Sequence, residues 1–505
     1  MAMCSTGRAW FWRVAVFLAE AAYMLLELLA ARTLAPTFGT TLDVWTSVIG
    51  CVLLASAVGN WIGGKLSDRP WLPVLALSLT GVICALVPGF AASAPAVKAF
   101  VGGSGTAGAL AMSFLLFFLP CIGAGILPPY AMVAASDTTG SVGKAAGGMY
   151  AAATLGGLAG TFLGGFWLIP AFGTSLLTYC VALAYGAIAM ACWVVASIGG
   201  QSPSKRWFGL SVAAIALAVA SMASTTALSG AVSENGPVSF TQDTRYGHVT
   251  VYDDGDLRRM NVDGGFESAM WLGAGRESEP VFEYVRCIEE LAEPRLQDDG
   301  TSVLCFGGAA YQLPKHLLDN TSATVEVCEI DDGVTEIARE WFALDEVDAR
   351  NPGRLDVHHV DGRVFVNDAQ AGTYDVVVND TFAGNTPARV LATKEAAEAI
   401  RASMKPDGVY LTNIIGDVDN PDAFMRHELA TLSEVFDDVV LVNPYKTSGN
   451  LGGTRCNWIV ACGDDVRAKL PQNAGFHQMP DLDGVEVLTD DWCPVEAITA
   501  VERQQ

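Results

Sequence analysis

Long apolar runs separated by short polar stretches make up the first 230 residues. A run of about 20 apolar residues can cross a bilayer as a helix. The first run is too long for a cleaved signal peptide and leads directly into further runs. We therefore predict an α-helical polytopic membrane domain at residues 1–230. Its seven candidate spans are residues 10–34, 42–66, 71–93, 107–135, 146–171, 174–198 and 207–230.

From about residue 237 the pattern changes to short strands that alternate with helices. Residues 249–262 predict a β-hairpin around an Asp/Gly-rich turn. Beyond residue 296 the alternation predicts an α/β domain with a parallel sheet. The expected strands are 302–306, 323–328, 355–359, 374–378 and 409–412, with 438–443 and 456–462 as an antiparallel pair. The predicted domains are residues 1–230, a small β-domain with a linking helix at 231–295, and 296–505.

Charge separates the same two regions. Residues 1–230 hold 9 Lys and Arg against 5 Asp and Glu, a balance of +4, whereas the remainder holds 21 against 49, a balance of −28. With 51% hydrophobic and 17% charged residues, the chain is neither disordered nor collagen-like. No basic patch supports nucleic-acid binding. The six His residues are scattered or paired at one strand end, so we predict no metal site.

Two indications of sidedness disagree. Positively charged residues gather on the cytoplasmic side of membrane proteins. On this rule the N-terminus is cytoplasmic, and seven spans then place residue 231 onwards outside the cell. Twelve Cys without any C-x-x-C motif instead favour a reducing, cytoplasmic location. We expect a multi-pass protein of the cell membrane with a cytoplasmic C-terminal domain; Pro120, Pro128 and Pro129 leave open that the run 107–135 is re-entrant, which would change the parity.

Two features of the membrane region allow a functional and a structural interpretation. Glu27 and Arg32 are charged residues near one end of the first run, and they are either functional or a structural ion pair. Residues 59–69, with three Gly before Lys65 and Arg69, resemble a loop of major-facilitator transporters. A tight turn with cytoplasmic positive charges explains most of that stretch without transport.

Polar or small residues follow four of the predicted parallel strands. Gly307 and Gly308, Glu329, Asp361 and Asp380 stand at these carboxyl ends, where ligands bind on such sheets. Glycines let the backbone approach a ligand at a helix N-terminus. A carboxylate about 20 residues later accepts hydrogen bonds from ribose hydroxyls, and the spacing from Gly308 to Glu329 is 21. Each acid alone is also explained as a loop residue or a helix N-cap; together they predict a nucleoside-type site.

These motifs resemble those of the spermidine synthase (aminopropyltransferase) family. The resemblance also extends over the membrane region, so that the chain is similar to a membrane-fused branch of the family. It implies a Rossmann-like, methyltransferase-type sheet with a small N-terminal β-hairpin domain, behind a transporter-like membrane domain. The residues that carry it are 303–308, 329–331, 361–363, 374–380, 246–268, 488–496 and, in the first run, 27–32, Pro36 and 38–39.

The resemblance implies transfer of an aminopropyl group from decarboxylated S-adenosylmethionine, as co-substrate, to an amine such as putrescine. Asp380 would be the general base with Tyr284 beside it. The nucleoside would be held by Gly307, Gly308, Glu329, Asp361 and Gly362, and the amine by Tyr246 and Glu267. We expect a polyamine and the lipid bilayer as partners, no nucleic acid and no metal, and we leave a homodimer open.

The sequence departs from the family pattern at the amine end. Soluble members have an Asp where Ala309-Ala310-Tyr311 stand here, and a second Asp where Ala383 stands. Glu267 occupies the place of a Gln and would restore one anionic contact. Two alternatives therefore stay open: an S-adenosylmethionine-dependent methyltransferase, and a non-catalytic nucleoside or polyamine sensor coupled to the transporter-like domain.

Overall fold

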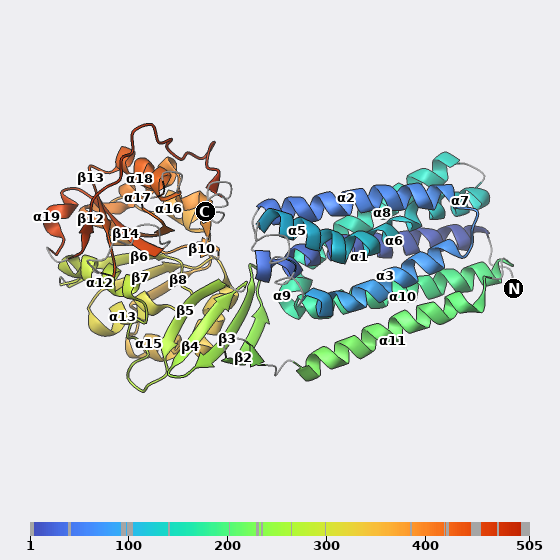
Figure 1. The fold of residues 1–505 in the computed structure, drawn as a ribbon, viewed down its shortest axis with the longest axis horizontal. Helices are drawn as coiled ribbons and strands as arrows, with labels where there is room; N and C mark the ends of the chain where they lie inside the picture. The colour runs from blue at the N-terminus through green and yellow to red at the C-terminus, as the bar shows by residue number, and fades with distance from the viewer. Residues whose placement is uncertain are drawn as a thin grey trace. The chain divides into compact units, whose positions relative to one another are not determined.

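A computed structural model describes residues 5–38, 42–91, 97, 105–139, 142–200, 203–228, 232–233, 236–263, 265–297, 299–383, 386–418, 420, 424–445, 456–471 and 474–495. The chain divides into two compact units, one helical and one α/β (Figure 1). The helical unit comprises Met1–Ala231 with Gln242–His248. The α/β unit comprises Val232–Thr241 with Val249–Gln505.

Residues 1–230 consist, where the structure describes them, of helices and the turns between them, as the apolar runs predict. In these described residues, seven helical stretches are long and apolar enough to cross a membrane. The unit contains α1 (Ser5–Phe38), α2 (Leu42–Lys65), α3 (Leu72–Ala91), α5 (Gly105–Ser113), α6 (Leu119–Gly125), α7 (Leu127–Thr139), α8 (Val142–Leu163), α9 (Ile169–Phe172), α10 (Thr174–Ile198) and α11 (Lys205–Leu228).

Two of the seven helices are irregular at the same kind of place. A π-helical turn at Phe114–Phe118 precedes Pro120, and another at Gly164–Leu168 precedes Pro170. Proline has no backbone N–H and disturbs the turn before it, which explains both. The run 107–135 is helical apart from the turn at Ile126, although Pro128 and Pro129 suggested a possible break.

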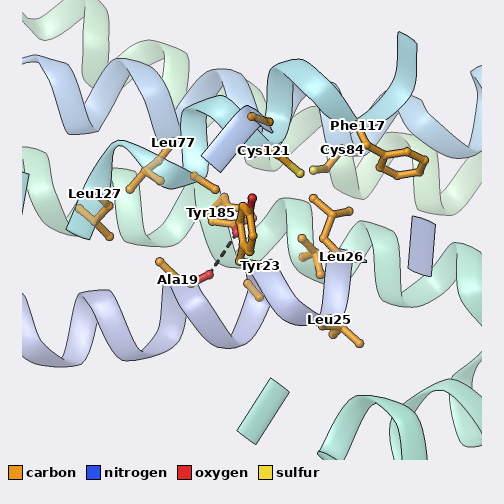
Figure 2. Packing of buried hydrophobic residues seen from close by; sticks show 14 of the residues in the cluster. Ala19, Tyr23, Leu25, Leu26, Leu77, Cys84, Phe117, Cys121, Leu127 and Tyr185 are labelled. Carbon is orange, nitrogen blue, oxygen red and sulfur yellow. Dashed lines mark hydrogen bonds between the residues drawn. The ribbon is translucent and has the colours of Figure 1, made fainter. Parts of the chain in front are cut away.

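Apolar side chains fill the centre of the helical unit, together with a few hydroxyl groups. Tyr23 donates to the carbonyl of Val52 at 2.9 Å. Tyr185 donates to that of Ala19 at 3.1 Å (Figure 2). Because each buried hydroxyl has a carbonyl partner, these tyrosines join neighbouring helices without an unsatisfied polar group. Among the described residues, no ion pair joins Glu27 to Arg32.

An antiparallel sheet in the order β1-β2-β3-β4-β5 begins the α/β unit. Its strands are β1 (Val232–Ser233), β2 (Gly236–Asp243), β3 (His248–Asp254), β4 (Leu257–Val262) and β5 (Gly265–Trp271). The hairpin predicted at 249–262 is confirmed as β3 and β4, where Val249 pairs with Val262. The adjoining helix α12 is Glu283–Leu296.

A second sheet follows the order β15-β13-β14-β12-β9-β6-β7-β8. The five strands from β12 to β8 are parallel, and β14, β13 and β15 continue the sheet antiparallel. This confirms the predicted α/β class. The strands are β6 (Ser302–Phe306), β7 (Thr324–Cys328), β8 (Leu355–His358), β9 (Tyr374–Asn379), β12 (Met404–Gly416), β13 (Asp438–Val442), β14 (Cys456–Gly463) and β15 (Phe476–His477); a separate two-stranded ribbon pairs β10 (Phe382–Ala383) with β11 (Thr386–Pro387).

Both faces of this sheet are buried, since alternate residues of its central strands belong to different apolar clusters. Val376 and Val378 pack on one face with α12 and α13 (Gln312–Asn320). Val377 packs on the other with α17 (Lys394–Ser403) and α18 (Phe424–Val435). The remaining helices are α14 (Asp332–Trp341), α15 (Leu344–Arg350), α16 (Gly362–Asp368), α19 (Val466–Lys469) and the short 3₁₀-helix Arg389–Leu391.

Sequence periodicity missed some elements. The linking helix predicted within 231–295 is α12, which begins at Glu283 after the extended residue Phe282. Helices α15, α16 and α18 were not predicted; α15 and α16 have only seven residues each, too few to show a period. Within the motif 488–496, Asp490 accepts from Thr393 at 2.7 Å and so joins the segment to the N-cap of α17; Glu496 lies outside the described residues.

Candidate functional site

The candidate site lies where the order of the parallel strands reverses. From β6 the chain proceeds to β7 and β8 on one side, whereas β9 and β12 lie on the other. In open α/β sheets the crevice at such a point, beyond the carboxyl ends of the strands, is where ligands bind. Gly307 follows β6 and Asp380 follows β9, so the reversal brings these two residues together.

Glycine is required directly after β6. Gly307 has a φ of +88°, and a Cβ atom there would lie 2.7 Å from the carbonyl oxygen of Asp380. A Cβ on Gly308 would lie 2.7 Å from the ring of Tyr311. The loop therefore runs close to β9 and to its own next turn, which only residues without side chains permit.

Glu329 fixes the conformation of this glycine loop. Its Oε2 accepts from the amides of Gly308 at 2.8 Å and Ala309 at 3.3 Å, and its Oε1 accepts from Asp331 at 3.0 Å. The side chain is buried, and burial raises the pKa of the carboxyl while the backbone donors oppose the rise. Three of about four acceptor positions on the carboxylate are thus already engaged.

Asp361 and Gly362 form the start of α16. One oxygen of Asp361 accepts from the amide of Arg363 at 2.8 Å, which makes it the N-cap. A Cβ on Gly362 would lie 2.7 Å from the ring of Phe306, the last residue of β6. Asp361 therefore caps a helix, which is one of the two roles that the sequence allowed. It stands after the strand where we predicted an acid that binds the nucleoside.

Asp380 is held by two side-chain donors. The hydroxyl of Tyr284 on α12 donates to Oδ2 at 3.1 Å, and the amide of Asn413 on β12 donates to Oδ1 at 2.8 Å. Burial raises the pKa of Asp380, and both donors counteract it. Burial and the neighbouring Asp380 raise the pKa of Tyr284 well above its ordinary value, so Tyr284 remains a donor.

Aromatic rings line the approach to Tyr284. Phe282 stacks on Tyr284 with ring centroids 5.6 Å apart, and Phe266 meets Phe282 edge-on at 5.3 Å. The charge of Glu267, on β5 beside Phe266, is among the causes that raise the pKa of Tyr284. The structure thus brings Glu267 near the pair of Tyr284 and Asp380.

Tyr246 belongs to the segment 242–248 that groups with the helical unit, whereas Glu267, Tyr284 and Asp380 belong to the α/β unit. It lies in the bend between β2 and β3, its side chain is exposed, and its amide donates to the hydroxyl of Thr244. Its predicted role in binding the amine stays a prediction.

Ala310 stands in the stretch where the resemblance led us to expect an acidic residue. It is completely buried in an apolar cluster with Val249, Met260 and Phe342. Tyr311 next to it is also completely buried, and its hydroxyl bonds to Thr335 at 2.7 Å. An Asp at position 310 would place a carboxylate in this cluster, so the surrounding residues have adapted to alanine.

Sequence reasoning missed two residues at the site. Asn413 directly follows the predicted strand 409–412, and Asp380 stands two residues after the predicted strand 374–378. The sequence pattern therefore could have indicated Asn413 as a site residue. Gln312 accepts from the amide of Val281 at 2.8 Å and donates to Ser268 at 3.0 Å, which connects the β5 strand to the segment before α12. No periodic signal marks a residue that acts through such long-range bonds.

The arrangement places a glycine loop and a proton acceptor side by side. A half-buried carboxylate with a raised pKa, beside a glycine loop fixed by a second acid, suits removal of a proton from a nucleophile. Within the described residues, no three His, Cys, Asp or Glu side chains are grouped as a metal site requires.

Comparison with known families identifies this unit in part. Residues 242–446, less than half of the chain, match the family model described as the spermine/spermidine synthase domain. The predicted resemblance is thereby confirmed over that segment. A probable spermidine synthase from Corynebacterium glutamicum has a TM-score of 0.42 and 22% identity, covering 50% of this chain and 97% of that one.

Curated relatives match over shorter segments. Spermidine synthase 1 of Hyoscyamus niger is 34% identical over 106 residues, 21% of this chain and 32% of that protein. Polyamine aminopropyltransferase of Nitrosomonas europaea is 31% identical over 168 residues, 33% of this chain and 49% of that protein. Putrescine N-methyltransferase 3 of Nicotiana tabacum is 29% identical over 131 residues, 26% and 34% respectively. The chain thus spans less than half the length of each of these relatives.

Proposed function

We propose that this chain is a membrane-bound aminopropyltransferase of the spermidine synthase type. It would transfer an aminopropyl group from decarboxylated S-adenosylmethionine to an amine such as putrescine. The observation that carries this proposal is the pair of carboxylates at the switch point. Glu329 holds the glycine loop, and Asp380 lies across from it with Tyr284 at 3.1 Å.

Asp380 is the proposed general base. An alkylammonium has a pKa of roughly 10, so a nucleophilic amine must lose a proton before or during attack. The amine nitrogen forms a bond to the methylene carbon next to the sulfonium, and the carbon–sulfur bond breaks. Its electron pair neutralises the sulfur, which leaves as methylthioadenosine, and the proton of the amine passes to Asp380.

Glu329 and Asp361 are the proposed contacts to the nucleoside. Glu329 has one acceptor position left beside its three backbone bonds, so a two-hydroxyl ribose contact would replace the longest bond, from Ala309 at 3.3 Å. Asp361 uses one oxygen as N-cap and would accept from an adenine amine with the other.

Glu267 is the proposed contact to the far end of the amine. With alanine at position 310 in an apolar cluster, the acidic residue that soluble members place there is replaced by a core residue. Phe266 already has the guanidinium of Arg259 over its ring at 5.0 Å, which shows that aromatic faces beside Glu267 attract cations. A cationic amine bound by one carboxylate and aromatic rings fits these residues.

Methyl transfer is the second candidate, favoured by the similarity to putrescine N-methyltransferase. The nucleophile and the base would be unchanged, and the amine would attack the methyl carbon of S-adenosylmethionine instead. The leaving product would then be S-adenosylhomocysteine.

The deciding experiment offers both sulfonium compounds to the full chain in detergent with a panel of diamines and monoamines. Mass spectrometry identifies the product. Amine-dependent methylthioadenosine supports the proposal and names the acceptor, whereas S-adenosylhomocysteine supports the methyltransferase. A folded protein that binds the nucleoside without either product would point to the sensor.

The helical unit is proposed to cross the membrane, with the α/β unit in the cytoplasm. Large apolar side chains point outwards from its helices, among them Trp61, Phe166 and Trp167, each more than 60% exposed. The cysteines of the α/β unit are free thiols among the described residues, as a reducing compartment requires. Seven crossings from a cytoplasmic N-terminus argue against a cytoplasmic α/β unit, because an odd number of spans places it on the other side of the membrane. A reporter fused to the C-terminus decides: activity only outside the cell would overturn the cytoplasmic placement.

A further inference from the structure

A chain of carboxamide bonds leads away from Asp380. Asn413 donates to Asp380 through Nδ2 at 2.8 Å and accepts through Oδ1 from Nδ2 of Asn457 at 3.1 Å. The hydroxyl of Tyr445 reaches Oδ1 of Asn457 at 3.5 Å. Asn413 is buried, so both ends of its carboxamide depend on these protein partners.

The chemistry of the chain fixes the orientation of Asn413. A carboxylate only accepts hydrogen bonds, so the amide nitrogen of Asn413 must face Asp380. Asn457 then donates to the oxygen that remains, and a rotated Asn413 would place two acceptors against each other. The parallel register supports the same placement, because Thr412 pairs with Asn379 and the next residues along are Asn413 and Asp380.

We infer that Asn413 is a positioning residue for Asp380: held by Asn457, it fixes one carboxylate oxygen and keeps Asp380 in the anionic, proton-accepting form. The inference rests on the proposed function for its effect on transfer. Tyr284 holds the other oxygen, so the two donors together set the plane of the carboxylate. The lone pairs that remain face the site in which the amine must lose its proton.

The two titratable side chains that interact directly with Asp380, Cys305 and Tyr284, remain neutral near neutral pH. Burial raises the pKa of the Cys305 thiol on β6 to about 12, with Asp380 as a further cause. Tyr284 on α12 stays protonated, since its pKa is raised well above the ordinary value. Glu267 on β5 and Tyr445 are further electrostatic causes of the raised pKa of Tyr284, and neither is among the causes that shift the pKa of Asp380. Among the direct neighbours of Asp380, Asn413 is therefore the polar partner that does not titrate. Its replacement changes the pKa of Asp380 without removing another titratable group.

The test uses Asn413→Leu, which keeps the size and removes the donor. Without this bond, burial is less opposed and the pKa of Asp380 rises. The acid limb of the pH profile of kcat/KM should move to higher pH, and kcat/KM at pH 7 should fall roughly 10- to 100-fold, as for a lost bond to a charged group. Asn413→Asp should move the limb in the same direction, because a second carboxylate opposes the charge. Asn457→Leu should cause a smaller shift.

The matched control is Asn351→Leu. Asn351 also donates to a carboxylate at 2.8 Å, that of Asp319, which stands at the C-terminal end of α13, whereas the glycine loop precedes the N-terminus of that helix. The acid limb should not move in this variant. An equal shift in Asn351→Leu and Asn413→Leu would overturn the inference.

A second measurement does not depend on transfer. The difference in unfolding free energy between the full chain and its Asp380→Asn variant, followed against pH, reports the ionisation of Asp380. In the Asn413→Leu background this transition should move to higher pH. No movement, with transfer intact, overturns the inference and leaves the proposed function standing. If the transition moves to higher pH in a protein that shows no transfer, Asn413 does position Asp380, and the proposed function is overturned.

Discussion

The two units of this chain bury polar groups in different ways. In the helical unit, hydroxyls such as those of Tyr23 and Tyr185 donate to backbone carbonyls of neighbouring helices. In the α/β unit, the buried carboxylate of Glu329 and the half-buried carboxylate of Asp380 lie at strand ends and accept bonds from amides and a phenol. A hydroxyl bonded to a carbonyl costs little to bury, whereas a buried carboxylate needs several donors.

This difference supports the location that we propose for the site. In the helical unit, hydroxyl groups donate to backbone carbonyls and join neighbouring helices. Neither role requires a group that titrates. Buried acids with raised pKa values at a strand reversal carry a cost in stability that packing does not require. Such a cost is typical of functional sites.

The largest expected effect is loss of transfer in Asp380→Asn. The amide cannot accept a proton from the amine, so kcat should fall by ~10²–10⁴-fold, the usual contribution of a general base. Binding of the nucleoside, measured by calorimetry, should be nearly unchanged. Asp356→Asn, an exposed acid on β8, serves as the control. Full activity in Asp380→Asn would contradict this contrast between the two units, because the acid of the α/β unit would then have no role in transfer.

The next effect concerns a buried charge of the α/β unit outside the site. Lys315 is completely buried, its ammonium bonds only to the carbonyl of Phe342 at 2.6 Å among the described contacts, and burial lowers its pKa from 10.5 to about 7. Between pH 7 and 10.5 the unfolded chain binds more protons, so stability rises with pH across this window.

Lys315→Met should remove that rise, worth on the order of a few kcal/mol. Denaturant unfolding at a series of pH values measures it. Lys394→Met, at a half-exposed lysine of α17, should retain the slope. A slope that survives in Lys315→Met would show that the lysine is charged throughout.

A helical-unit variant tests packing alone. A Cβ on Gly156 would collide with the backbone carbonyl of Phe17, so α1 and α8 approach each other closely here. Gly156→Leu should lower the stability of the unit in detergent by about 1–3 kcal/mol or more, since the clash is with backbone. Gly147→Leu on the same helix meets nothing within 4 Å and should be tolerated. Equal thermal stability of the two variants would contradict this helix contact.

The smallest expected effect is that of His316→Gln. His316 lies 2.7 Å from Glu289, and although burial opposes it, this pair raises the pKa of the imidazole. The folded state thus gains stability below pH 6.5, which is lost as the pH rises through the folded pKa. The gain should be about 0.5–1 kcal/mol. Comparing unfolding at pH 5.5 and 8, with His427→Gln as the control, should reveal the loss only in His316→Gln.

Much of the site could be predicted from sequence because its residues follow apolar strands. Gly307, Glu329 and Asp380 each end a run of buried residues, and parallel strands bring such ends to one edge. Asn413 follows the same rule and was overlooked, since an Asn after a strand is also an ordinary turn residue. Tyr284 was expected beside Asp380 only through the family resemblance, and the hydrogen bond between them is a tertiary contact.

The amino-acid pattern by itself determined the seven apolar helices, the α/β class and the acids at the strand ends, because these depend on local periodicity and on the alternation of elements. Tertiary structure alone decided that Ala310 lies in an apolar cluster, that Lys315 is buried, and that Asn457 and Asn413 form a chain to Asp380. Each of these depends on which distant segments meet, with partners between 27 and 61 positions away in sequence. Local sequence patterns do not encode these tertiary contacts, since the hydrogen bonds and burial that define them exist only once the sheet has formed.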